Sequence, residues 1–273
     1  MKTIYLAPSD LEQVLEPLRK DPDGTMVMAG GTALLWAVRL LGKPAMPRSV
    51  ISLQNLKGLL GQIKFGPGTE VGAQVSLATL AGEMSGGEGI PSILAQAARS
   101  VGFPGIRRTA TLGGNLANGV MPSQVLPALA ALGATVHLRS SSGHRRVELA
   151  KSVAEGTYYP IVIPGELITS VSIPRDNIPA RQSYVDFAWP GKDPVVIAVV
   201  FCQGRLRVAL LADQRLSLWV TETGANVLGK ERQAELTERA CLSFGLTQSS
   251  PLSQIDVYRR RGMLVRALQR IGD

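Results

Sequence analysis

Several kinds of residue are scarce in this chain of 273 residues, and each scarcity excludes a class of protein. The chain has two cysteines, too few for a disulfide scaffold or for an iron–sulfur cluster of its own, since such a cluster takes about four cysteine ligands. Cys202 and Cys241 lie in apolar stretches, so we expect two buried free thiols. Aromatic residues make up 5% of the chain and do not interleave its short basic clusters, which argues against nucleic-acid binding.

Histidine is equally rare. His137 and His144 are the two in the chain, and neither is accompanied by cysteines or acidic residues at metal-ligand spacing. Neither has a nearby partner that would form a nucleophile–base pair. A hydrolase or a metalloenzyme would have to use Asp, Glu, Lys and Tyr alone, and no such set stands out. The sequence therefore nominates no catalytic residue and no metal site.

We also expect neither a membrane-spanning helix nor a signal peptide. The longest uncharged stretch, residues 109–138, contains Asn115, Asn118, Gln124 and two prolines, which a spanning helix would not tolerate together. We expect a soluble, cytoplasmic protein. Its formal net charge of +8 favours anionic partners such as a phosphate-bearing ligand or an acidic protein surface.

The residues that are present predict two domains with mixed helix and sheet. Hydrophobic residues make up 45% of the chain and charged residues 18%, a globular balance. Ser9 and Glu12 form a capping-box pattern for a first helix, in which Pro17 should kink or shorten the last turn. Periodicity and turn residues predict further strands at 26–29, 50–53, 134–139, 146–149, 166–173, 195–201 and 206–211, and helices at 33–41, 76–82, 91–101, 122–132, 230–244 and 254–271.

Two loops of the same kind carry the functional signal, Gly30-Gly31-Thr32 and Gly113-Gly114-Asn115. Paired glycines let successive backbone N–H groups approach an anion, and the first loop also lies where a helix begins. A pyrophosphate needs more donors than one turn supplies, and the side chains of Thr32, Thr111 and Asn115 would add some. Each loop alone is also consistent with a tight structural turn, and their pairing in one region favours phosphate binding.

A third glycine-rich segment, from Gly224 to Lys230, matches a P-loop until its last position. Glu231 stands where a Ser or Thr hydroxyl should bind Mg²⁺, so a turn leading into a helix is the better interpretation. A P-loop nucleotide-binding protein remains an alternative.

Residues 27–35 and 106–117 resemble the two flavin loops of the FAD-binding medium subunit of molybdenum hydroxylases, the family of xanthine dehydrogenase and aerobic carbon monoxide dehydrogenase. The segment Ile106-Arg107-Arg108-Thr109-Ala110-Thr111-Leu112-Gly113-Gly114-Asn115 is the most specific match. Connecting segments agree in order along essentially the whole chain.

The resemblance implies an α+β fold of the PCMH/vanillyl-alcohol-oxidase type. An FAD-binding domain would span residues 1–165, with subdomains at about 1–55 and 56–165. A C-terminal domain with an antiparallel sheet and helices would span residues 166–273. The implied role is an electron-transfer subunit of a hetero-oligomeric oxidoreductase. It would take electrons from a [2Fe-2S] subunit, which receives them from a molybdenum-cofactor subunit, and pass them to NAD, oxygen or another acceptor.

The resemblance also assigns cofactor-binding residues by position. The pyrophosphate of FAD would lie between the two loops, Gln124 would contact the sugar-alcohol chain, and Leu167 would touch the flavin ring. The loop residues so assigned are Ala29, Gly30, Gly31, Thr32, Ala33, Leu34, Thr111, Gly113, Gly114 and Asn115.

Two positions depart from the family pattern. Gln124 stands where the family has an aspartate, and Asp186 stands where it has a lysine. A cation near the flavin would stabilise its anionic reduced form, whereas the Asp186 carboxylate would oppose it. These departures motivate a second alternative, a flavin-fold protein that serves in assembly or regulation without redox activity.

Overall fold

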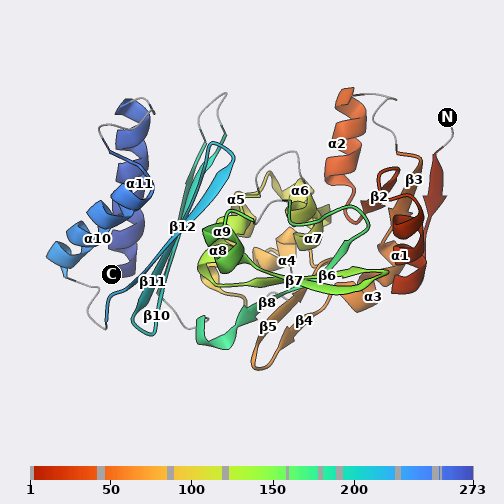
Figure 1. The fold of residues 1–273 in the computed structure, drawn as a ribbon, viewed down its shortest axis with the longest axis horizontal. Coiled ribbons are helices and arrows are strands. Elements are labelled where there is room, and N and C mark those ends of the chain that lie inside the picture. The colour runs from red at the N-terminus through yellow and green to blue at the C-terminus, as the bar shows by residue number, and fades with distance from the viewer. Residues whose placement is uncertain are drawn as a thin grey trace.

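The computed structural model describes residues 3–41, 47–84, 89–118, 123–157, 160–177, 181–188, 193–224, 229–247, 252 and 254–272. Three sheets follow one another along the longest axis of the molecule (Figure 1). A three-stranded sheet lies at the N-terminal end, a five-stranded sheet with its helices lies in the middle, and a four-stranded sheet backed by two helices lies at the C-terminal end. The predicted α+β class is confirmed.

The N-terminal sheet is parallel, with strand order β1-β3-β2. Its elements are β1 (Ile4–Leu6), α1 (Leu11–Lys20), β2 (Thr25–Met28), α2 (Thr32–Leu41) and β3 (Ser49–Ser52), followed by a 3-10 turn (Gln54–Leu56) and α3 (Lys57–Leu60). The apolar face of α1 packs on the sheet and forms the N-terminal core, which consists of Val14, Leu15, Leu18, Ile51, Leu53, Leu56, Leu60 and Leu167.

The start of α1 differs from the predicted capping box by one residue. Asp10 is the N-cap, and its carboxylate accepts a hydrogen bond of 2.9 Å from the Gln13 N–H. The Gln13 side chain in turn accepts one from the Ser9 N–H at 3.3 Å. Asp10 and Gln13 thus replace Ser9 and Glu12, since an aspartate caps as well as a serine does. The helix also continues past Pro17 to Lys20, so the proline does not shorten it.

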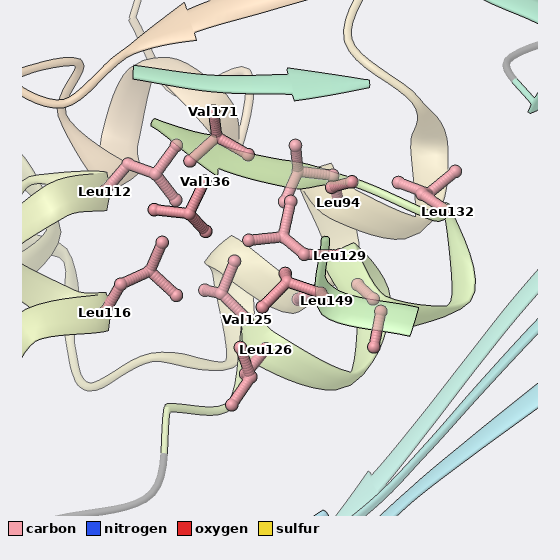
Figure 2. Close-up of a cluster of buried hydrophobic side chains, with 14 of the residues drawn as sticks. Leu94, Leu112, Leu116, Val125, Leu126, Leu129, Leu132, Val136, Leu149 and Val171 are labelled. Atoms are coloured by element: carbon pink, nitrogen blue, oxygen red, sulfur yellow. The ribbon is translucent and has the colours of Figure 1, made fainter. Parts of the chain in front are cut away.

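The central sheet is antiparallel, with strand order β4-β5-β8-β6-β7. Short helices cover its inner face and pack around the main core, which includes Leu112, Leu116, Leu129, Val136 and Val171 (Figure 2). The strands are β4 (Ile63–Phe65), β5 (Gly68–Gly72), β6 (Thr135–Ser140), β7 (Gly143–Glu148) and β8 (Leu167–Pro174). The helices are α4 (Leu77–Leu80), α5 (Ser92–Ser100), α6 (Pro104–Thr109), α7 (Leu112–Ala117), α8 (Leu126–Ala131) and α9 (Leu149–Ala154).

The C-terminal sheet is antiparallel in the order β12-β11-β10-β9. The predicted hairpin at Gln203-Gly204 is confirmed, and both residues have positive φ, as a two-residue hairpin turn requires. Cys241 is buried as predicted, but Cys202 near this turn is only half-buried; both thiols are free. The elements are a 3-10 turn (Arg175–Asn177), β9 (Arg181–Phe187), β10 (Val195–Cys202), β11 (Arg205–Ala212), β12 (Arg215–Glu222), α10 (Lys230–Ser243) and α11 (Gln254–Gly272).

Strand β10 is buried on both faces and joins the two larger parts of the molecule. Val196 and Ala198 belong to the main core, whereas Ile197 and Val199 pack with α10 and α11. The predicted domain division stays a prediction, but strand pairing bears on it: β8 pairs with β5 and β6 in the central sheet. A boundary after Pro174 would keep that sheet whole, whereas one at residue 165 would cut β8 from it. Within the described residues, no helix has the length and apolarity needed to cross a membrane.

Candidate functional site

The first glycine loop connects β2 to α2. Gly31 has φ +73°, a conformation that glycine adopts without strain, and α2 begins at the next residue, Thr32. Within the described residues, the N–H groups of Gly31, Thr32 and Ala33 donate to no protein acceptor, whereas the Leu35 N–H closes the first helical turn onto the Gly31 carbonyl at 2.9 Å. The loop therefore offers successive free amides at the positive end of a helix of 10 residues, an arrangement that binds phosphate.

The second loop is built differently from the expectation. The segment predicted as the second glycine loop begins α7, with Thr111 as N-cap, and the Thr111 hydroxyl accepts from the Gly114 N–H at 3.1 Å. The Gly113 N–H donates to the Ala73 carbonyl at 2.8 Å, and the N–H groups of Leu112 and Asn115 are also bonded within the protein. Four successive amides are thus already used, so this loop supplies side chains and a close approach of backbone rather than a second set of free amides.

Packing explains why the second loop needs glycines. A Cβ at Gly113 would lie 2.7 Å from the Ala73 Cβ, closer than real Cβ contacts allow, and one at Gly114 would lie 3.0 Å from the Thr111 hydroxyl. Leu112 and Leu116, on the other side of α7, point into the main core (Figure 2). The helix is therefore held by its apolar face, while Gly113 lies against Ala73 and Gly114 against the side chains of Thr111 and Ala29.

The two loops, about 80 residues apart in the sequence, meet directly. A Cβ at Gly30 would lie 1.8 Å from the Thr109 carbonyl oxygen and 3.1 Å from the Ala110 Cα, so the backbones are in contact there. A Cβ at Gly114 would lie 4.0 Å from the Ala29 Cβ, so the second loop also approaches the residue just before Gly30. Figure 1 shows this meeting point between α2 and the pair α6 and α7. The arrangement brings the free amides of the first loop next to the Thr111 and Asn115 end of the second.

Hydrogen bonds connect the second loop to Gln124 and to the C-terminal sheet. Ser123 donates to the side-chain oxygen of Asn115. The next residue, Gln124, is half-buried, and its backbone carbonyl accepts from the Tyr184 hydroxyl at 3.1 Å. That hydroxyl also lies 2.9 Å from the Ser100 hydroxyl at the end of α5. Tyr184 on β9 therefore holds the chain that carries Gln124.

Leu167 belongs to an apolar cluster. It is 5% exposed and belongs to the N-terminal core, with Ala29 packed against the same cluster. It thus lies at the seam between the first two sheets, where β8 begins. Ala33 and Leu34 are half-buried in the first turns of α2.

Asp186 lies two residues beyond Tyr184 on β9, on the same side of the strand, because side chains alternate along a strand. That side faces the central sheet and its helices, since Tyr184 belongs to the main core and Val185 to the C-terminal one. Partial desolvation raises the pKa of the Asp186 carboxyl. Asp186, one of the two departures from the family pattern, therefore lies on the face of β9 that adjoins Gln124.

Two residues of this region were not singled out from the sequence, Tyr184 as a tether and Arg107 as a buried cation. Arg107 is 7% exposed, whereas its neighbour Arg108 is exposed. The Arg107 guanidinium holds the pKa of the Glu83 carboxyl below its usual range. Two adjacent arginines are equivalent as sequence, and only the direction of each side chain on α6 separates them.

The two histidines come together, though not at the loops. The rings of His137 and His144 stack with centroids 5.5 Å apart on β6 and β7, and His137 Nε2 lies 2.8 Å from the Ser172 hydroxyl. Burial and the neighbouring His144 lower the pKa of His137. Among the described residues, no group of three or more potential ligands from His, Cys, Asp and Glu could hold a metal ion. The P-loop-like segment falls partly outside the described residues, which omit 225–228.

An α+β fold with free amides at a helix N-terminus beside a second glycine turn is typical of a nucleotide-binding class of protein. The chain belongs to the family described as the FAD binding domain in molybdopterin dehydrogenase, whose model matches residues 1–176. The suspected family is confirmed, and FAD is the cofactor of this domain. The free amides and the close glycine contacts fit such a diphosphate ligand.

Individual relatives agree with this family assignment. The chain is 33% identical over 186 residues to the nicotine 6-hydroxylase medium subunit of Paenarthrobacter nicotinovorans, covering 67% of this chain and 62% of that subunit. It is 29% identical over 171 residues to the carbon monoxide dehydrogenase medium chain of Afipia carboxidovorans, covering 62% of this chain and 58% of the relative. The matched sequence therefore spans about three fifths of these relatives' lengths.

Solved structures match over more of the chain. A chain of quinoline 2-oxidoreductase from Pseudomonas putida 86 superposes with a TM-score of 0.76 at 25% identity, covering 100% of this chain and 96% of that one. A chain of reconstituted CO dehydrogenase from Oligotropha carboxidovorans gives a TM-score of 0.78 at 21% identity, covering 100% and 98%. The fold of the C-terminal part is thus shared as well. These matches support the flavin interpretation and neither the P-loop nor the assembly alternative.

Proposed function

We propose that this chain is the FAD-binding electron-transfer subunit of a molybdenum-containing hydroxylase or dehydrogenase. Relatives named as medium subunits or chains of such oxidoreductases support this. Among the described residues, no three His, Cys, Asp or Glu side chains come together as ligands, so in this proposal the [2Fe-2S] clusters lie on a partner subunit and the molybdenum cofactor on another. FAD would supply the redox chemistry, passing electrons on to NAD, oxygen or another acceptor.

In this proposal the residues of the chain bind and orient the cofactor. The N–H groups of the first loop, Gly30 to Leu34, would donate to the diphosphate at the N-terminus of α2, with Ala29 against its side. Thr111, Gly113, Gly114 and Asn115 would close on it from α7, mainly through the two polar side chains. Gln124 would hydrogen-bond hydroxyls of the sugar-alcohol chain, and Leu167 would exclude water from one side of the flavin ring.

The observation that carries the proposal is the contact between the loops, where Gly30 lies against the Thr109 carbonyl. We take two turns that are distant in sequence and face one another beside free amides as one candidate binding site. Because the chain belongs to an FAD-binding family, we assign FAD to that site.

Purification tests the proposal directly. We expect the full chain, expressed with the genes beside its own, to carry a flavin absorption spectrum and to copurify with a molybdenum subunit and an iron–sulfur subunit. The Gly114→Val variant should lose FAD while staying folded, because the new side chain would displace the Thr111 cap. A colourless protein that stays colourless with added FAD would favour the assembly alternative, and Mg²⁺-dependent ATP binding would favour the P-loop.

A further inference from the structure

Arg107 is the most completely bonded charged side chain beside the second loop. Its Nη2 lies 2.6 Å from Glu83 Oε1 and its Nε 3.0 Å from the same oxygen. Its Nη1 donates to three backbone carbonyls at the end of α5, those of Gly102 at 2.8 Å, Arg99 at 3.1 Å and Val101 at 3.3 Å. One guanidinium thus joins α6, the end of α5 and the segment after α4.

The same short helix leads straight to the contact between the loops. α6 ends at Thr109, two residues beyond Arg107, and the Thr109 carbonyl is the group that touches Gly30. The next residues lead into α7, where the Ala110 carbonyl accepts from the Leu77 N–H at 2.9 Å and Thr111 caps the helix. A displacement of α6 would therefore be transmitted to the Thr109 carbonyl and to the Thr111 cap.

We propose that Arg107, clamped by Glu83 and by three carbonyls in and just after the last turn of α5, is a positioning residue for the cofactor: it sets the gap between the two glycine loops without touching FAD. The clamp rests on the proposed site, since it acts only if both loops hold the diphosphate. Arg107 is 7% exposed and its guanidinium is bonded to Glu83 and to backbone carbonyls, so its effect on the ligand would pass through the backbone from Ile106 to Thr111.

The chemistry of the clamp requires arginine. A planar guanidinium reaches a carboxylate and carbonyls in several directions at once, whereas a lysine ammonium is a compact charge on a flexible stem. Lysine would retain the attraction to Glu83 and lose most of the carbonyl bonds. Arg107→Lys therefore loosens the position of α6 while keeping the charge.

A matched arginine exists far from the loops. Arg260 on α11 is also 7% exposed, and its Nη2 lies 2.8 Å from Asp213 Oδ1 in the turn between β11 and β12. None of its described contacts involves either glycine loop. Arg260→Lys thus controls for the general effect of weakening a buried arginine–carboxylate pair.

The test is FAD titration of the full chain by quenching of flavin fluorescence, at a temperature where circular dichroism shows each variant folded. For Arg107→Lys we expect the FAD Kd to rise at least about tenfold, while Arg260→Lys stays within about twofold of wild type. If Arg107→Lys does not fold, Glu83→Gln, which keeps the shape of the acceptor and removes its charge, should raise the Kd at least about threefold.

The proposal is overturned if Arg107→Lys, or Glu83→Gln in its place, binds FAD with the wild-type Kd. It is equally overturned if Arg260→Lys weakens binding as much, because the effect would then be general destabilisation. Wild-type chain that binds no FAD would count against the proposed site itself, an outcome distinct from a normal Kd in the variants.

Discussion

The contact between the loops makes Gly30→Ala the sharpest test of the candidate site. The added methyl would lie 1.8 Å from the Thr109 carbonyl oxygen, and Cβ atoms are essentially never found within 3.0 Å of a neighbour. One loop must therefore retreat by about 1.2 Å, the difference between these two distances. The added Cβ is fixed to the backbone of residue 30, and the atom it meets is a backbone carbonyl oxygen. No side-chain rotation therefore relieves the overlap.

For a single added methyl group, we expect a large loss of both stability and FAD affinity. Overpacking of this kind destabilises a protein by about 1–3 kcal/mol. A hydrogen bond to a charged group contributes about 1.5–3 kcal/mol, so losing one or two phosphate contacts raises the FAD Kd by about 10- to 1,000-fold or more. Binding should therefore suffer well beyond what the loss of stability alone explains.

Gly58→Ala is the matched control. Gly58 lies in α3, and a Cβ there would have no neighbour within 4 Å. Alanine should leave stability unchanged or raise it by up to about 1 kcal/mol, with no effect on FAD. Flavin fluorescence titration and thermal unfolding of both variants provide the comparison. A wild-type FAD Kd in Gly30→Ala would refute the idea that the contact at Thr109 shapes the cofactor site.

Three further predictions follow from other contacts. Thr111→Val removes the hydroxyl that caps α7, so the free energy of unfolding in urea should fall by about 1 kcal/mol and the FAD Kd should rise. Thr111→Ser keeps the hydroxyl and should keep the wild-type stability and Kd. Equal behaviour of the two variants would contradict this prediction. The pKa of His137 is lowered by burial, so the unfolded chain binds its proton more readily; stability to urea should fall as the pH drops below about 6.5, and less so in His137→Gln. Burial raises the pKa of the Cys241 thiol, so alkylation followed by mass spectrometry should modify Cys241 only after denaturation, and modification of the native protein there would argue against its burial.

Most regular elements could be predicted from local pattern. Alternating and periodic apolar residues marked β6, β8, β10 and the long helices α10 and α11, because one face of each must be buried. The capping residue of α1 was missed by one position, since Ser9 and Asp10 are both good caps and only the backbone decides between them.

The helix α7 shows where local pattern fails. Two glycines in six residues oppose a helix, because glycine loses the most backbone entropy when it is ordered. Tertiary contacts outweigh that preference: Leu112 and Leu116 are buried in the main core, and the Gly113 N–H is bonded to Ala73. The pattern singled out segments that the structure brings together, and it gave the wrong conformation for the second one, which begins α7.

By itself the sequence determined the family, the cofactor and the positions of the two glycine loops, because adjacent glycines beside small polar residues leave a recognisable local pattern. Only the tertiary structure decided which loop keeps free amides, that Gly30 lies against Thr109, and that Arg107 rather than Arg108 is buried. These depend on contacts between segments about 80 residues apart, and the free energy of such contacts comes from packing and backbone hydrogen bonds that no local pattern encodes.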